Sequence, residues 1–363
     1  MKLWKLWSIT LVMLVLVISI PTHAQEEINA ATVGENEAIT LENLPERVML
    51  SGTEMIWQDI SRCSAAALTI QLSYWRDDYN YWETISYLNH REEDVSVRLD
   101  EMIVYAETFG LKGIERMGGT LDMLKLLIAN GFPVLIENSY YDSNSIDDWM
   151  SHNRVIIGYD DTLGVLYSFD SLRGNDDGAG IQFEYTFVEE RWRSLNNAYM
   201  VLYEPEDEQF LQAIMGDQWD TTANAEWSLQ MAQAELDNQQ SDSFSLFNKG
   251  TALVTLGRYQ EAAEAYDRAR EIGLPWRMMW YQFGPLEAYL QVGRTEDVYQ
   301  IVRNVITNAP GVEEMYYYIA RAYLGDGNTE RAIANLEATL WRNPNYSAAQ
   351  ELLDELCATA TCQ

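Results

Sequence analysis

Apolar residues recur at helical spacing just after a polar stretch near residue 60. From Trp57 to Trp75 the chain reads WQDISRCSAAALTIQLSYW, and the apolar positions predict an amphipathic helix that is buried on one side. Ser61 is the expected N-cap, which would place Cys63 in the first turn. There the positive end of the helix dipole favours the thiolate, the form of cysteine that attacks carbonyl carbon. A buried structural cysteine is the alternative interpretation.

The pattern then changes from helical to alternating spacing. Two further helices are predicted over Ser96–Phe109 and Thr120–Asn130. After them come short β-rich runs bounded by turn residues, which predict strands over Pro133–Glu137, Arg154–Tyr159, Val165–Phe169, Gln182–Thr186 and Tyr199–Tyr203. Helices followed by strands indicate an α+β domain over residues 48–205, with the helices packed on an antiparallel sheet.

One predicted hairpin carries a histidine and an aspartate. The turn Asp160–Gly164 joins the strands Arg154–Tyr159 and Val165–Phe169. If the hairpin is centred near Asp161, His152 and Asp170 face each other with Cβ atoms about 5 Å apart. A carboxylate at that distance can orient an imidazole and stabilise its charge. A register error would place the two on opposite faces, and a single histidine is more often structural than catalytic.

The first 24 residues are predicted to be a signal peptide. Lys2 and Lys5 precede an apolar run over Ile9–Ile20, which is followed by a small-residue end at Ala24. We therefore expect cleavage after Ala24, a secreted or extracytoplasmic protein, and no stable membrane span after cleavage. An uncleaved anchor is the alternative, but the run is too short to span a bilayer comfortably.

Charge and composition exclude several function classes. Residues 25–47 are acidic with little periodicity, which predicts a linker. The whole chain has 24 Lys and Arg against 56 Asp and Glu, a formal net charge of −32 that repels nucleic acid and anionic lipid. Three widely spaced histidines and the lack of a Gly-rich phosphate loop predict neither a metal site nor a cofactor.

The chain has three cysteines, an odd number for an exported protein. Cys357 and Cys362 are near enough in the C-terminal tail, residues 357–363, to form a disulfide. Cys63 is then left without a partner. Because an unpaired thiol is an oxidation liability, this favours a working nucleophile, with a free buried thiol as the alternative.

Beyond an acidic run at residues 204–208 the pattern is wholly helical. Phe210–Gly216 and Ala223–Leu236 are predicted helices within a helical connector over residues 206–242. Gly257, Gly293 and Gly327 then recur at steps of 36 and 34 residues, each within an order of small and large apolar residues that resembles the tetratricopeptide pattern.

This periodicity predicts an all-α tetratricopeptide-repeat solenoid of about three repeats over residues 243–356. The concave face of such repeats commonly docks peptides or partner proteins, so a protein partner there is expected. The aromatic segment Leu274–Tyr281 between repeats is expected to pack the solenoid against the first domain, with a peptide-binding groove as the alternative.

The motifs of the first domain together resemble a peptidase family. Gln58 precedes Cys63, Ser-His-Asn-Arg-Val-Ile-Ile-Gly-Tyr-Asp-Asp follows about 90 residues later, and Tyr-Ser-Phe-Asp ends at Asp170. In order and spacing this is similar to the bacteriocin-processing (double-glycine leader) peptidase-like branch of the papain-like cysteine peptidases, over about Met49 to Tyr203.

The resemblance implies a role for each matching residue. Cys63 would be the nucleophile and His152 the general base, with Asp170 holding the imidazole in orientation. Gln58 and the backbone N–H of Cys63 would form the oxyanion hole. The sequence departs from the family at two places: Ser64-Ala65 stand where Gly-Pro is usual, and Ser171 stands where Pro is common.

The first hypothesis is therefore an exported cysteine peptidase or amide hydrolase that acts on a peptide or protein substrate through a Cys-His-Asp triad, with repeats that dock substrate or partner. The second is a peptidase-like binding protein that lacks activity, and the third is a structural scaffold in which the repeats do everything.

Overall fold

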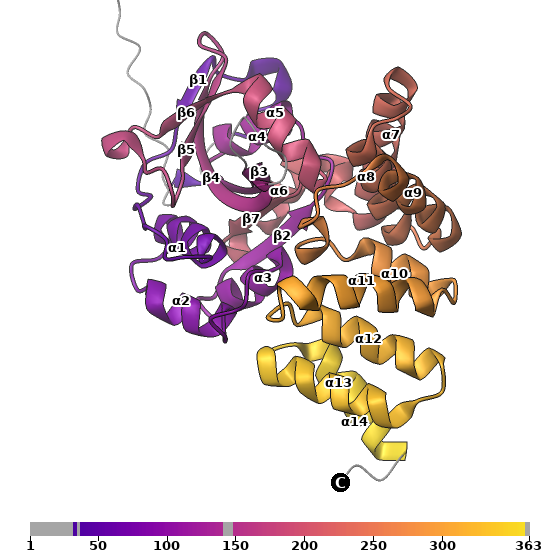
Figure 1. Cartoon of the computed structure of the whole chain (residues 1–363). Helices are drawn as coiled ribbons and strands as arrows, with labels where there is room; N and C mark the ends of the chain where they lie inside the picture. The colour runs from indigo at the N-terminus through magenta and orange to yellow at the C-terminus, as the bar shows by residue number, and fades with distance from the viewer. Residues whose placement is uncertain (1–31, 35–36, 141–147, 360–363) are drawn as a thin grey trace, which may run out of the picture.

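The computed structural model describes residues 32–34, 37–140 and 148–359. It has a sheet-containing domain beside a curved stack of helices that runs to the C-terminus (Figure 1). The predicted signal peptide lies outside the described residues. None of the helices within these ranges has the length and apolar character needed to cross a bilayer.

A seven-stranded antiparallel sheet forms the centre of the first domain among the described residues. The strand order is β2-β7-β3-β4-β5-β6, and β1 pairs with β4 beside this path. The strands are β1 (Arg47–Met49), β2 (Lys112–Arg116), β3 (Val134–Tyr140), β4 (Met150–Asp160), β5 (Val165–Phe169), β6 (Ile181–Glu184) and β7 (Tyr199–Tyr203).

Five helices accompany the sheet: α1 (Cys63–Trp75), α2 (Tyr81–Leu88), α3 (Leu99–Glu107), α4 (Leu121–Ala129) and α5 (Tyr185–Trp192). Short 3-10 helices lie between the longer elements: η2 (Leu41–Asn43), η4 (Asp176–Gly178), η5 (Arg193–Leu195), η6 (Pro205–Asp207), η7 (Gly216–Trp219) and η8 (Met278–Trp280). The predicted α+β domain with helices on an antiparallel sheet is confirmed.

Helix α1 lies inside the domain instead of on its surface. Every residue from Ala65 to Trp75 is buried, so the expectation of a helix buried on one side only is wrong. Its polar side chains find partners there: Gln71 Nε2 donates to the carbonyls of Pro133 at 2.9 Å and Met200 at 3.3 Å. These bonds satisfy an amide in the core and tie α1 to the sheet.

The start of α1 also differs from the prediction. Arg62, not Ser61, is the N-cap residue, and it makes no side-chain capping bond. Ser61 has a left-handed φ of 58°, so it belongs to the turn before the helix. The Arg62 guanidinium anchors that turn by donating to the carbonyl of Asp94 at 3.0 Å. Cys63 is thereby the first residue of α1.

The β4–β5 register differs from the predicted hairpin by two residues. Val155 pairs with Phe169 and Ile156 with Ser168, and a bulge follows between Ile156 and Gly158. Continued outward, this register sets Arg154, not His152, opposite Asp170. The hairpin closes at the pair Asp160 and Val165, so its centre lies between Thr162 and Leu163 and not near Asp161, and the extra residue of the bulge in β4 moves the register back by one. His152 still reaches Asp170, as a diagonal neighbour on the same face.

Part of the predicted acidic linker packs on the domain. The backbone N–H of Ile39 donates to Asn130 Oδ1 at 2.8 Å, and Asn130 Nδ2 donates to the carbonyl of Ile39 at 2.9 Å. Tyr159 Oη donates to the carbonyl of Pro45 at 2.8 Å, just before β1 begins at Arg47. The prediction of a linker is therefore wrong for this stretch, because its backbone groups are satisfied by the domain.

The C-terminal part is wholly helical, as predicted. Its helices are α6 (Glu208–Met215), α7 (Thr221–Asn238), α8 (Ser243–Thr255), α9 (Tyr259–Ile272), α10 (Gly284–Gln291), α11 (Thr295–Asn308), α12 (Glu314–Gly325), α13 (Thr329–Arg342) and α14 (Ser347–Thr359). From α7 to α14 each helix packs on the next. Helix α10 contacts α8 and α12 as well. Gly257, Gly293 and Gly327 have φ between 69° and 75°, the left-handed conformation that turns one helix into its partner.

The repeats pack closely against the first domain. Trp149, just before β4, is 1% exposed and belongs to the apolar core of the repeats. Its ring lies 6.0 Å from that of Tyr281, and its carbonyl accepts from Arg277 at 3.4 Å. The aromatic segment between repeats thus contacts the first domain, as expected. At a second contact, the space for a Cβ atom on Gly311 is filled by the backbone of Glu93 and Asp94.

We predict that Gly311→Ala loosens the repeats from the first domain. An added Cβ would lie 2.1 Å from the carbonyl oxygen of Glu93 and 2.8 Å from the amide nitrogen of Asp94, both backbone atoms. Overlap of this kind costs about 1–3 kcal/mol. Urea unfolding should show a loss of that size, and small-angle scattering should show a larger radius of gyration.

Gly325→Ala is the matched control, because the nearest atom to its new Cβ would be Thr295 Cγ2 at 3.5 Å. Equal stability and equal size for the two variants would contradict the packing at Gly311.

Candidate active site

Cys63 and His152 come together where α1 meets β4. Cys63 is a free cysteine at the first position of α1, and its partly buried side chain lines a cleft. His152 lies in β4, is 3% exposed, and hydrogen-bonds to the sulfur. Two residues that are 89 positions apart are therefore placed in contact by the packing of one helix on the sheet.

Asp170 lies at the other side of the imidazole and is fully buried. Its Oδ1 is 3.0 Å from His152 Nε2, and its Oδ2 accepts from Arg154 Nε at 2.7 Å. The backbone N–H groups of Leu172 and Arg173 donate to Oδ1 at 2.9 and 3.1 Å. Because Nε2 is engaged by the carboxylate, Nδ1 is the ring nitrogen left for the sulfur.

The electrostatics of the three groups support one another. Burial raises the pKa of the Asp170 carboxyl, but His152 and Arg154 outweigh it and hold that pKa far below its usual range. Burial lowers the pKa of His152, but the hydrogen bonds and charges of Asp170 and Cys63 raise it to about 9. The imidazole is therefore protonated at neutral pH in the resting site.

The thiol is shifted in the complementary direction. Burial raises the pKa of Cys63, but the hydrogen bond and charge of His152 lower it. The backbone N–H of Asn153 and the hydroxyl of Ser64 add two further donors, and the net pKa lies below its ordinary value. A thiolate beside an imidazolium is the form that such a site stabilises.

Three residues in this network were missed by the sequence analysis. Asn153 Nδ2 donates to Ser64 Oγ at 2.9 Å and lies 4.0 Å from Cys63 Sγ. Arg154, only 2% exposed, pairs with Asp170 and lies 4.2 Å over the Phe183 ring. The available signal was the placement of Asn and Arg inside an apolar strand, because buried polar side chains of that kind need partners. The hydroxyl at Ser64, a departure from the family pattern, is used as a donor.

Gln58 lies at the Asp170 end of the site. Its backbone N–H donates to the carbonyl of Ser171 at 3.1 Å, and its Oε1 accepts from Ser171 Oγ at 2.8 Å. Its Nε2 is directed toward the carbonyl of Asp59 at 3.5 Å. The structure thus brings Cys63, His152 and Asp170 into one hydrogen-bonded chain and holds Gln58 beside it.

The cleft at Cys63 is walled by both parts of the chain and has a volume of about 480 Å³. The first domain contributes Glu115 and Glu137, and the repeats contribute Thr251 of α8 and Tyr281. Burial, then the charges of Glu115 and Cys63, raises the pKa of Glu137 to about 8. Burial and Asp100 raise the pKa of Glu115 to about 7. These carboxyl groups therefore carry much less than their full negative charge at neutral pH, and Arg98 and Arg116 line the same cleft.

The remaining cysteines lie far along the chain. Cys357, in α14, is disulfide-bonded, and Cys362, its expected partner, lies outside the described residues.

Comparisons with known proteins agree with this division. Residues 50–200 match the Peptidase_C39 like family, and residues 245–272 match the tetratricopeptide repeat. Among curated proteins, aryl-hydrocarbon-interacting protein-like 1 of Mus musculus is 28% identical over 120 residues, covering 29% of this chain and 37% of that protein. The Bos taurus protein of the same name gives the same identity and coverage. The chain thus spans about a third of the length of the curated relatives it matches.

Two solved structures are similar to parts of the chain. MamA from Desulfovibrio magneticus RS-1 (residue 41 to its end) is 19% identical with a TM-score of 0.34, covering 42% of this chain and 82% of that one. A double-glycine motif protease from an AMS/PCAT transporter, solved in complex with the leader peptide, is 14% identical with a TM-score of 0.31. It covers 41% of this chain and 90% of its own.

This chain therefore carries a domain of the Peptidase_C39 like family at residues 50–200, followed by a helical region that contains a tetratricopeptide repeat at residues 245–272.

Proposed function

We propose that this protein is an exported cysteine peptidase, or a related amide hydrolase, that cleaves peptides held between the peptidase-like domain and the repeats. The observation that carries the proposal is the buried chain from Cys63 through His152 to Asp170, which stabilises a thiolate next to an imidazolium. The signal-peptide pattern before residue 25 supports export.

In the proposed mechanism the Cys63 thiolate attacks the scissile carbonyl carbon. The C–N bond then breaks, and the His152 imidazolium gives its proton to the leaving amine. Water attacks the resulting thioester, with neutral His152 taking its proton, and the released acid leaves the thiolate and imidazolium as they began. Asp170 keeps the ring in orientation throughout and stabilises its charge.

The oxyanion in this scheme is stabilised by the backbone N–H of Cys63 and the side-chain amide of Gln58. Ser171 Oγ donates to Gln58 Oε1 and so fixes which end of that amide is the donor end. Gln58 Nε2 lies 3.5 Å from the carbonyl oxygen of Asp59, which is a long and therefore weak hydrogen bond. The amide can exchange this bond for one to the substrate oxygen.

Substrate recognition is proposed to use both walls of the cleft. Thr251 and Tyr281 bring the repeats to the rim of the site, so a bound peptide would contact them as it passes the sulfur. Glu115 and Glu137 on the peptidase-like side, whose raised pKa values keep a large fraction of them protonated at neutral pH, can donate hydrogen bonds to carbonyl groups of the bound peptide.

The first test is the reactivity of Cys63. Iodoacetamide should alkylate Cys63 of the native protein at neutral pH, because its pKa is lowered. Cys63→Ala should keep the native circular dichroism spectrum and lose hydrolysis of a fluorogenic peptide mixture by at least about 10³-fold. Full activity in this variant would contradict the mechanism, and a thiol with ordinary reactivity would favour a binding protein without activity.

The second test is the pH profile. The thiolate is lost as pH falls through the lowered pKa of Cys63, and the imidazolium is lost as pH rises through about 9. Peptide cleavage needs both forms, so its rate should fall on the alkaline side near pH 9. Alkylation by iodoacetamide needs only the thiolate and should not fall there. A parallel alkaline decline of both rates would instead indicate unfolding.

The third test separates the oxyanion hole from the nucleophile. Gln58→Ala should lower peptide turnover by about 10²–10³-fold, because one donor to the oxyanion is removed. Its alkylation rate should stay unchanged, since alkylation forms no oxyanion. Asp59→Asn, at the exposed neighbouring position, is the control and should leave both rates near the wild-type values. Unchanged turnover in Gln58→Ala would remove Gln58 from the site.

A further inference from the structure

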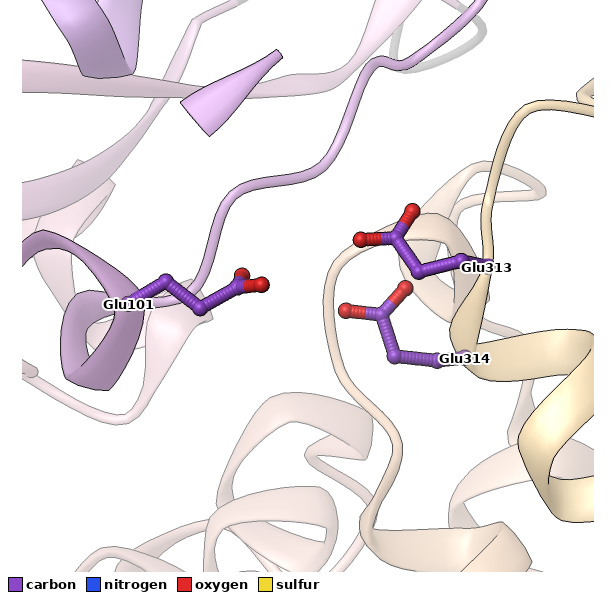
Figure 2. Close-up of side chains that lie close together, drawn as sticks. All are labelled: Glu101, Glu313 and Glu314. Carbon is purple, nitrogen blue, oxygen red and sulfur yellow. The ribbon is translucent and has the colours of Figure 1, made fainter. Parts of the chain in front are cut away.

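Three glutamates from distant parts of the chain meet where the repeats contact the peptidase-like domain. Glu101 lies in α3, Glu313 precedes α12, and Glu314 is the first residue of α12. One carboxylate oxygen of each lies within 4.8 Å of the others. Figure 2 shows the Glu101 carboxylate pointing from the peptidase side toward those of Glu313 and Glu314 on the repeat side.

The glutamates are held in place and shielded from water. Asn343 Nδ2 donates to Glu101 Oε1 at 2.6 Å and to Glu313 Oε1 at 2.9 Å, and so bridges the two sides. Glu313 is 2% exposed and Glu314 is fully buried, while the Glu101 side chain is 16% exposed. The arrangement is therefore preorganised and not a set of acids that lie free on the surface.

The negative charge of this cluster is only partly balanced. Arg98 donates to Glu314 at 3.0 Å and lies 3.8 Å from Glu101, but it also pairs with Asp100 on its other side. Buried Asp94 adds a fourth carboxyl close to the three glutamates. Burial and mutual repulsion raise the pKa of Glu313 and Glu314 well above the usual range. Arg98 thus pairs with two of these four carboxyl groups, and the nearby Arg62 guanidinium donates to the backbone carbonyl of Asp94.

A separate observation points to a ligand at this cluster. Glu314 Oε1 accepts from Arg98, but Glu314 Oε2 is buried without a hydrogen-bond partner. A carboxylate oxygen that is buried and unpaired is costly, because it has lost its water and gained nothing in return. A cation among the three glutamates would satisfy this oxygen and offset the excess charge together.

We propose that Glu101, Glu313 and Glu314 bind one Ca²⁺ ion that links the peptidase-like domain to the repeats. Ca²⁺ takes six to eight oxygen ligands at about 2.3–2.6 Å, so ligands on opposite sides of the ion lie about 4.6–5.2 Å apart. The oxygens of the three glutamates lie within 4.8 Å of one another, a span that one Ca²⁺ ion can bridge. Mg²⁺ demands near-ideal octahedral geometry at about 2.0–2.1 Å and gives up its waters reluctantly, whereas carboxylates held by Asn343 and Arg98 have little freedom to adopt that geometry.

The ion would also act next to the cleft. Arg98 and Asp100, at the start of the helix that carries Glu101, line the cleft at Cys63. Because the ligands come from both parts of the chain, Ca²⁺ would hold the repeats at a fixed distance from the peptidase-like domain and so keep the second wall of the cleft in place.

Calorimetric titration of the full, metal-free protein with CaCl₂ at neutral pH tests the proposal. One site is expected, with a dissociation constant of about 10⁻⁵–10⁻³ M. Saturating Ca²⁺ should raise the melting temperature by about 2–5 °C, because the ion binds only the folded protein. MgCl₂ should bind at least about 10-fold more weakly. The proposal would be overturned if about 10 mM CaCl₂ produced no binding heat and no change in melting temperature.

Variants on both sides of the contact locate the site. Glu314→Gln and Glu101→Gln keep the size of the side chain, and each should weaken Ca²⁺ binding at least about 10-fold. Glu235→Gln removes a carboxylate that pairs with Arg193 at 3.1 Å elsewhere between the two parts, and should leave binding unchanged. If one of the first two fails to fold, the other still tests the site. Unchanged binding in both, or equal loss in Glu235→Gln, would overturn the assignment.

Discussion

The candidate active site of this protein depends on one buried charge. Asp170 is fully buried, and a lone carboxylate there would be strongly unfavourable. Arg154 and two backbone N–H groups satisfy most of its acceptor capacity, and the remaining position is taken by His152. Each partner therefore offsets part of the free-energy cost of burying the Asp170 carboxylate. The end of β5, the imidazole and the thiolate are consequently positioned by the same carboxylate, and disturbing it affects all of them.

The helical repeats complete the site and are not a separate attachment. The side chain of Trp149, which precedes β4 of the peptidase-like domain, packs in the core of the repeats. Tyr281 of the repeats in turn lines the cleft at Cys63. This exchange of side chains means that neither wall of the cleft keeps its shape if the two parts separate. The volume near Cys63 is thus set by the relative position of two units that have different folds and different sequence patterns.

Sequence alone predicted the residues of the candidate chain from Cys63 through His152 to Asp170 but not how they reach each other. Cys63 and His152 stand in recognisable local patterns, and Val165–Phe169 was predicted with the limits that β5 has. The register failed because the hairpin closes at Asp160 and Val165 and is centred between Thr162 and Leu163, a position that the turn composition around Asp161 does not fix. Strands β1 and β2 escaped notice because they are short and lack a clear alternation, so they are strands through pairing with β4 and β7 and not through propensity. Ser61 was a reasonable cap by type, but the turn anchored by Arg62 excludes it.

Contacts between the two parts could not be predicted from local sequence patterns, and the reason is physical. Arg98 and Glu314 are 216 positions apart, and nothing local distinguishes Glu313 and Glu314 from the many other acids of a chain with 56 of them. Their burial follows from the close packing of the two parts, which also brings Gly311 against the backbone of Glu93. A surface acid is ordinary, whereas the same acid covered by a second domain needs a counter-charge. Its chemistry is therefore created by the packing of the two parts and cannot be read from either sequence segment.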